Sequence, residues 1–137
     1  LDHERCREMS CAVIGIGSNT PDRMERVAAA IRWLGRVFSD GFHSSVYMTR
    51  AINGHDPDYL NAVMSVECDG TMDEVNIMLK DYERACGRTA ESKLHGEVPI
   101  DLDIVVWDGR IVRPKDFGYR YFLQGYDELV HRGVIQP

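Results

Sequence analysis

Two aspartates that lie two residues apart begin an apolar stretch in the last third of the chain. Asp101 and Asp103 flank Leu102 within residues 98–107, which are otherwise apolar and rich in β-branched side chains. In an extended strand, side chains i and i+2 point to the same face, so the two carboxylates should project together. Two like charges held this close repel each other, and each resists ionisation unless a cation lies between them.

A carboxylate pair on a rigid strand suits Mg²⁺ that must also hold substrate phosphates, because it offers few hard oxygen ligands and leaves coordination positions open. The simpler alternative for an isolated Asp-x-Asp is a strand that enters the core after two solvated aspartates. The elements around the pair, and the other polar residues of the chain, are needed to decide between these two interpretations.

Hydrophobic periodicity predicts the elements that must position this pair. The predicted order is a strand over 12–17, a helix over 22–36, strands over 43–49 and 59–67, a helix ending near 86, and a strand over 100–107. Thr71 and Glu74 have the spacing of a capping box at the start of the second helix. Asp108 and Gly109 predict a hairpin turn after the last of these strands.

The order βαββαβ predicts a ferredoxin-like α+β sandwich, with an antiparallel sheet and helices on one face. Residues 89–97 are polar and lack periodicity, so we expect a mobile loop there. The segment after the hairpin is rich in aromatic residues, and we expect it to be irregular. Residues 17–19 (Gly-Ser-Asn) precede the first helix and could serve as a helix cap or as an anion site.

The composition indicates one globular domain. The chain is 44% hydrophobic and 28% charged, and its net charge of −6 argues against a general nucleic-acid binder. No apolar run approaches the roughly 20 residues of a membrane span, and the charged start does not suit a signal peptide. The four cysteines form no Cys-x-x-Cys pair, which argues against zinc and for a reducing, cytoplasmic location. We expect a single domain over residues 1–137, with residues 1–10 as a loose extension.

Four short stretches carry a specific combination of residues in a fixed order. They are Ile-Gly-Ser-Asn at 16–19, residues 44–49 with 57–62, Tyr-Glu-Arg-Ala-Cys-Gly-Arg at 82–88, and Asp-Leu-Asp-Ile at 101–104. Together they resemble the family of 6-hydroxymethyl-7,8-dihydropterin pyrophosphokinases, which act in folate biosynthesis. The resemblance extends from Ile14 to about Leu123 and implies a ferredoxin-like fold, in agreement with the element order.

Members of this family transfer pyrophosphate from ATP to the hydroxymethyl group of a reduced pterin and release AMP. The resemblance implies that Asp101 and Asp103 hold two Mg²⁺ ions, and that these aspartates and Arg88 are the catalytic residues. Such a transfer needs the hydroxyl placed in line with the β-phosphorus and cationic groups that neutralise the developing charge. We expect pterin and ATP as small-molecule partners, no nucleic acid or membrane partner, and a monomer.

The resemblance also implies which side chains line the two halves of the site. The pterin-binding positions are Thr49, Tyr59, Asn61 and Phe122, of which Asn61 reads the pterin edge and the two rings stack on the pterin. The positions on the ATP side are Glu83, Arg88, Ile104, Lys115 and Arg120. Taken singly, the two rings could be core aromatics, and Glu83 and Arg88 could be ordinary helix charges.

The chain departs from the family's pattern at two places. Val98 lies three residues before the first aspartate, where the family commonly has an arginine, and the preceding loop offers only Lys93 and His95 as cations. The segment after the hairpin is shorter than usual, and Pro114-Lys115 stands where Pro-His is common. A cation lost at a transferring phosphate costs on the order of 100-fold in rate. Two classes of function therefore stay open, the pyrophosphokinase and a pterin- or nucleotide-binding paralogue without turnover.

Overall fold

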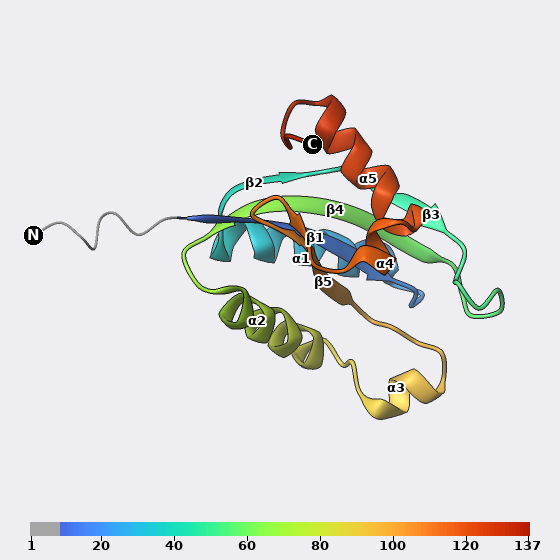
Figure 1. Ribbon diagram of the computed structural model, residues 1–137. Coiled ribbons are helices and arrows are strands. Elements are labelled where there is room, and N and C mark those ends of the chain that lie inside the picture. The colour runs from blue at the N-terminus through green and yellow to red at the C-terminus, as the bar shows by residue number, and fades with distance from the viewer. Residues whose placement is uncertain (1–8) are drawn as a thin grey trace, which may run out of the picture.

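The computed structural model describes residues 9–137, which form an antiparallel sheet with helices on both faces (Figure 1). The strands are β1 (Ser10–Ser18), β2 (Ser39–His43), β3 (Tyr47–Thr49), β4 (Tyr59–Cys68), β5 (Asp101–Trp107) and β6 (Arg110–Ile111). The helices are α1 (Arg23–Val37), α2 (Met72–Ala85), α3 (Ala90–Leu94), α4 (Pro114–Phe117) and α5 (Arg120–His131). The predicted fold class, a ferredoxin-like α+β sandwich, is confirmed. The prediction that the helices lie on one face of the sheet was wrong, because α5 packs on the face opposite to α1 and α2.

Strands β4 and β1 form the centre of the sheet. The strand order is β2-β4-β1-β5-β6, and β3 also pairs with β4. β5 lies on the other side of β1, so that Gly17 is opposite Asp101 in the ladder. β6 pairs with β5 only through Val106 and Trp107, so among the described residues the first part of β5 has no strand partner on its outer side.

The start of the chain is ordered earlier than we expected. β1 begins at Ser10, inside the range 1–10 that was predicted to be loose, and Ser10 pairs with Cys68 of β4. Residues 1–8 lie outside the described part, so the extension stays a prediction for them. Within residues 9–137, no helix has the length and apolar character needed to cross a membrane.

The face of the sheet that carries α1 and α2 holds the larger core (Figure 1). Ile14 and Ile16 of β1 point to this face, because strand side chains alternate, and both are buried. They share the core with Leu34 of α1 and Leu79 of α2, which come from the apolar stripes of the two helices. The predicted capping box at the start of α2 is present.

Helix α5 covers the opposite face of the sheet (Figure 1). We expected the segment after the hairpin to be irregular, and that expectation was wrong. Phe122 and Leu129 of α5 are buried with Val13 and Val63, whose side chains face away from α1 and α2. These apolar residues have helical spacing, but Gly125 between them lowers the intrinsic helix propensity. Gly125 instead allows close packing on β4, because a Cβ at this position would lie 2.6 Å from Val63 Cγ2.

Two other segments differ from their predicted form. The strand predicted over 43–49 is divided into β2 and β3, and between them Ser44 Oγ accepts a hydrogen bond from the Val63 N–H at 2.9 Å. The predicted loop over 89–97 contains the short helix α3, whose N-terminus is capped by Thr89. The mobility of this segment stays a prediction.

Candidate active site

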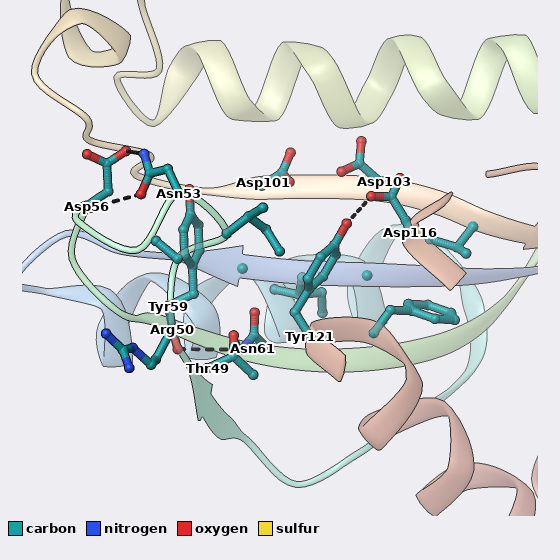
Figure 2. A pocket seen from close by; sticks show the side chains of 17 residues that line it. Thr49, Arg50, Asn53, Asp56, Tyr59, Asn61, Asp101, Asp103, Asp116 and Tyr121 are labelled. Atoms are coloured by element: carbon teal, nitrogen blue, oxygen red, sulfur yellow. Dashed lines mark hydrogen bonds between the residues drawn. The ribbon is translucent and has the colours of Figure 1, made fainter. Parts of the chain in front are cut away.

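A cavity of about 390 Å³ opens where β1, β4 and β5 meet the segment after β3 and the start of α5 (Figure 2). Pockets for small molecules have volumes of about 300–1,000 Å³, so the cavity can hold a bicyclic heterocycle. Six residues that the sequence analysis assigned to substrate or metal line this cavity, namely Thr49, Tyr59, Asn61, Asp101, Asp103 and Phe122.

Two glycines of β1 form the floor of the cavity. Gly15 and Gly17 are paired with Asp103 and Asp101 in the ladder, and both line the cavity. A Cβ at Gly17 would lie 3.5 Å from Asn61 Oδ1, so a side chain here would occupy space that a ligand needs. The Gly-x-Gly pattern of β1 therefore keeps this face of the strand flat, a role that the sequence analysis did not identify.

Asn61 is buried in the cavity wall, and its neighbours fix the orientation of its amide. Its Nδ2 donates to the main-chain oxygen of Tyr47 at 3.1 Å. It also donates to Thr49 Oγ1 at 2.8 Å, the bond drawn in Figure 2. These two bonds use both N–H groups of the amide. No donor within residues 9–137 reaches Asn61 Oδ1, so this oxygen is the acceptor that a ligand can use.

Aromatic rings form two further walls of the cavity. Tyr59 stands at the start of β4, and burial raises the pKa of its hydroxyl, so the ring stays neutral. Phe122 lies against the floor from α5 and also stacks on Tyr126, with ring centroids 5.6 Å apart, so it serves core and cavity together. Tyr121, which the sequence analysis did not assign, also lines the cavity, and its hydroxyl donates to Asp116.

Asp101 and Asp103 project from the same face of β5, as the i, i+2 spacing predicts (Figure 2). Burial, and then the like charge of Asp101, raise the pKa of Asp103 to about 6. The nearby cations Lys80 and Arg113 oppose this rise in the pKa of Asp103. The pair therefore concentrates negative charge at one end of the cavity, where it favours the binding of a cation.

Three cationic side chains of the described part of the chain contact the aspartates. Arg88 Nη1 donates to Asp101 Oδ1 at 2.7 Å, and Lys80 Nζ donates to Asp103 Oδ1 at 3.1 Å. Arg113 Nη1 lies 3.9 Å from the same oxygen of Asp103, while its Nε donates to an oxygen of Asp116. The sequence analysis included Arg88 in the site but missed Lys80 and Arg113.

Glu83 is buried between α2 and β5 instead of lining the cavity. Its Oε2 accepts from the Leu102 N–H at 2.7 Å and from Lys80 Nζ at 2.9 Å, and its Oε1 lies 3.1 Å from Arg88 Nη1. The carboxylate thus ties the end of α2 to the strand segment between the two aspartates. Lys80 precedes Glu83 by three residues and shares its helix face, and this spacing could have identified Lys80 from the sequence.

The other residues expected on the ATP side are placed apart from the aspartates' carboxylates. The Ile104 side chain is buried in the core under α1 and α2, because it alternates with Asp103 along β5. Lys115 lines a second cavity, of about 440 Å³, beside α4. Arg120 donates to Gln124 Oε1 on α5 and is outside the lining of both cavities.

Asn19 holds the end of the segment 89–97 against β1. Its Nδ2 donates to the Gly96 carbonyl at 2.8 Å, and its Oδ1 accepts from the Val98 N–H at 2.6 Å. The main-chain N–H of Asn19 also donates to the Val98 carbonyl at 3.1 Å. The side chain of Asn19 is therefore neither a helix cap nor an anion ligand here, because its amide positions the segment that precedes β5 and its aspartates.

The carboxylate oxygens of Asp101 and Asp103 are ligands of the kind that a hard divalent ion prefers. Within residues 9–137, no three His, Cys, Asp or Glu side chains are grouped to hold a metal by themselves. Two carboxylates on one strand, at the edge of a cavity, match Mg²⁺ whose coordination is completed by phosphate oxygens and water. Asp101 and Asp103 are the residues that would hold it.

Fold and site together define a small-molecule-binding α+β sandwich in which paired carboxylates border an amide- and aromatic-lined cavity. The profile of the family described as 7,8-dihydro-6-hydroxymethylpterin-pyrophosphokinase (HPPK) matches residues 13–130, and the chain belongs to this family. The resemblance inferred from the sequence is confirmed.

Two curated relatives are similar to the chain. One is the 2-amino-4-hydroxy-6-hydroxymethyldihydropteridine pyrophosphokinase of Aquifex aeolicus (strain VF5), 28% identical over 108 residues, which cover 78% of this chain and 67% of the relative. The other is the folate synthesis bifunctional protein of Arabidopsis thaliana, 32% identical over 97 residues, which cover 69% of this chain and 20% of the relative. The chain thus spans about two thirds of the first relative and a fifth of the second.

Proposed function

We propose that the protein transfers pyrophosphate from ATP to the hydroxymethyl group of 6-hydroxymethyl-7,8-dihydropterin and releases AMP, as a step in folate synthesis. The observation that carries this proposal is the position of the carboxylate pair at the edge of a cavity with a free amide acceptor and aromatic walls. Family membership supports it, as do the relatives, one named for this pyrophosphokinase and the other for folate synthesis.

The pterin occupies the cavity in this proposal. A pterin is a flat heterocycle with N–H donors along one edge, and Asn61 Oδ1 accepts from that edge. Tyr59 and Phe122 pack against its ring, while Gly15 and Gly17 leave room for it over β1. Unpaired polar groups in such a site discriminate strongly against ligands that lack the matching donor.

In this proposal the phosphates of ATP lie beside Asp101 and Asp103, which would hold Mg²⁺, two ions by analogy with the family. Bound magnesium supplies neutralisation of the phosphate charge. The protein's part is to bring the pterin hydroxyl oxygen in line with the β-phosphorus, so that the new P–O bond forms as the bond to AMP breaks and the hydroxyl proton is released. Arg88 and Arg113, which already contact the aspartates, add positive charge where the phosphates would lie.

An AMP-release assay with ATP, Mg²⁺ and the reduced hydroxymethylpterin tests the proposal. We expect release that depends on all three components and is lost in Asp101→Ala and Asp103→Ala, while both variants keep a native circular-dichroism spectrum. Asp127→Ala, which removes an exposed carboxylate from α5, is the matched control and should retain the parent rate. Asp103→Ala that bound Mg·ATP as well as the parent would contradict the assignment of the metal ligands.

A pterin- or nucleotide-binding protein without turnover is the second candidate. One observation favours it: Val98 contributes no charge, and no contact joins Lys93 or His95 to the aspartates within the described residues. Binding of the pterin and of Mg·ATP in calorimetry, without any AMP release, would select this candidate over the pyrophosphokinase.

A further inference from the structure

A chain of alternating charges links α2 to the aspartate pair. Glu83 is its centre, with Arg88 on one carboxylate oxygen and Lys80 on the other. Arg88 continues to Asp101 at 2.7 Å and Lys80 continues to Asp103 at 3.1 Å. Each cation therefore lies between the buried glutamate and one of the two carboxylates that border the cavity.

The ammonium group of Lys80 is surrounded by three oxygen atoms. Its Nζ lies 2.9 Å from Glu83 Oε2, 2.9 Å from the Leu102 carbonyl oxygen and 3.1 Å from Asp103 Oδ1. Three acceptors use all three N–H groups of the ammonium. Two carboxylate oxygens and one carbonyl oxygen are also ligands that a divalent cation accepts, so Lys80 occupies the place of a cation at Asp103.

The members of this cluster differ in their freedom to move. Glu83 is fixed, because its side chain is only 6% exposed and is bonded to the Leu102 N–H. The Lys80 side chain is 32% exposed and ends in a compact charge on a flexible stem of four carbons. Arg113 also lies near Asp103, but it is engaged by Asp116. Lys80 is therefore the cation that can leave Asp103.

We propose that Lys80 is a resident cation of Asp103, that a divalent ion displaces its ammonium from that carboxylate, and that the released ammonium then contacts the nucleotide phosphates. The two positive charges repel each other when they share one carboxylate, which drives the displacement. The second part of the proposal, the contact with phosphate, rests on the proposed function. The first part concerns the metal alone and can be tested without substrates.

The first experiment measures Mn²⁺ binding without nucleotide, from the electron paramagnetic resonance signal of the free ion. Lys80→Met removes the competing charge and should tighten Mn²⁺ binding by about tenfold. Arg84→Met is the matched control, because it removes a positive charge from the same helix one turn away, where Arg84 is paired with Asp81 instead of the site. The difference in Mn²⁺ affinity between Lys80→Met and Arg84→Met measures the competition between Lys80 and the metal at Asp103.

The second experiment measures binding of a non-hydrolysable ATP analogue in saturating Mg²⁺. Here Lys80→Met should weaken binding by about tenfold, because a charge-assisted contact to phosphate is lost. Tighter binding of Mn²⁺ together with weaker binding of the ATP analogue is the result that the displacement predicts. Lys80→Gln, which keeps a donor for the Leu102 carbonyl but carries no charge, should behave in the same way and replaces Lys80→Met if the latter does not fold.

The outcomes separate this proposal from the proposed function. Mn²⁺ affinity that is equal in the Lys80 and Arg84 variants, or weaker in the Lys80 variants, overturns the displacement. Tighter binding of both the metal and the nucleotide analogue overturns the contact with phosphate. Opposite signs in a parent protein that never releases AMP would support the displacement while contradicting the pyrophosphokinase.

Discussion

Among single residues, Asn61 shows how the fold reserves one polar atom for a ligand. Tyr47 and Thr49 of β3 accept both of its N–H groups, so the amide cannot rotate without breaking two hydrogen bonds. Its oxygen is left pointing to the cavity, between the floor at Gly17 and the ring of Tyr59. The pairing of β3 with β4 therefore determines what Asn61 can recognise.

We predict that Asn61→Ala weakens binding of the hydroxymethylpterin about tenfold or more, because a ligand donor left unpaired in a buried site costs about 1–3 kcal/mol. Isothermal titration calorimetry measures the change. Ser65→Ala, a buried polar position on the same face of β4 and outside the cavity, is the control and should leave the affinity unchanged. Equal pterin affinity in Asn61→Ala and the parent would give Asn61 a purely structural role.

At the scale of elements, β1 is unusual because one of its faces has no side chains over the cavity. We predict that Gly17→Val keeps the strand, since valine favours β structure, but raises the dissociation constant for the pterin about tenfold or more by filling the floor. Cys11→Val places the same side chain on the same face of β1 outside the cavity. Pterin affinity that falls equally in both variants would indicate a general disturbance of β1.

The segment between α3 and β5 is fixed by Asn19 but carries no charge at Val98. We predict that Val98→Arg raises the rate of AMP release several-fold, by about 1 kcal/mol of added stabilisation of the transferring phosphate. Val98→Met is the control, because it lengthens the side chain without adding a charge. Identical rates for Val98→Arg, Val98→Met and the parent would show that cations already present at the aspartates suffice.

The sequence was sufficient to predict those features that depend on residues close together in the chain. The aspartate pair followed from the two-residue period of a strand, and the start of α2 followed from its capping box. Helix α5 was missed because Gly125 interrupts its apolar stripe, and the reason for that glycine is a contact with Val63 of a distant strand. The spacing of Lys80 and Glu83 indicates only their pairing on α2. The contact of Lys80 with Asp103 was missed because it depends on how α2 lies against β5.

On the scale of the whole molecule, the site depends on a core on each face of the sheet. Helix α2, which lies with α1 on one face (Figure 1), brings Lys80 and Glu83 to the site, while α5 brings Tyr121 and Phe122 from the other face. Tyr47 joins α5 to β3, because its hydroxyl donates to the Tyr121 carbonyl at 2.7 Å and accepts from the Gly125 N–H at 3.1 Å. The cavity therefore requires that α5 be docked.

We predict that Gly125→Ala destabilises the protein by about 1–2 kcal/mol in urea unfolding, because overpacking against Val63 outweighs the better helix propensity of alanine. Gly118→Ala is the control, since a Cβ there meets its nearest atoms at 3.8 Å. Val63→Ala removes the atom nearest to the added Cβ, Val63 Cγ2, while Val63 Cβ at 2.9 Å remains, so the combination with Gly125→Ala should cost less than the sum of the two single changes. If the losses in free energy of unfolding were strictly additive in the double variant, α5 would dock on β4 without depending on the contact between positions 125 and 63.

The open outer side of β5 has a consequence for how separate molecules of the protein meet. A strand edge with free main-chain groups is a template for pairing with a strand of another molecule, and such pairing leads to aggregation. Here the outward N–H and carbonyl of Leu102 are taken by Glu83 and Lys80, and charged Asp101 and Asp103 flank them. Glu83 and Lys80 thus occupy the outward main-chain groups of Leu102, which makes this part of the β5 edge a poor template for pairing with a strand of another molecule.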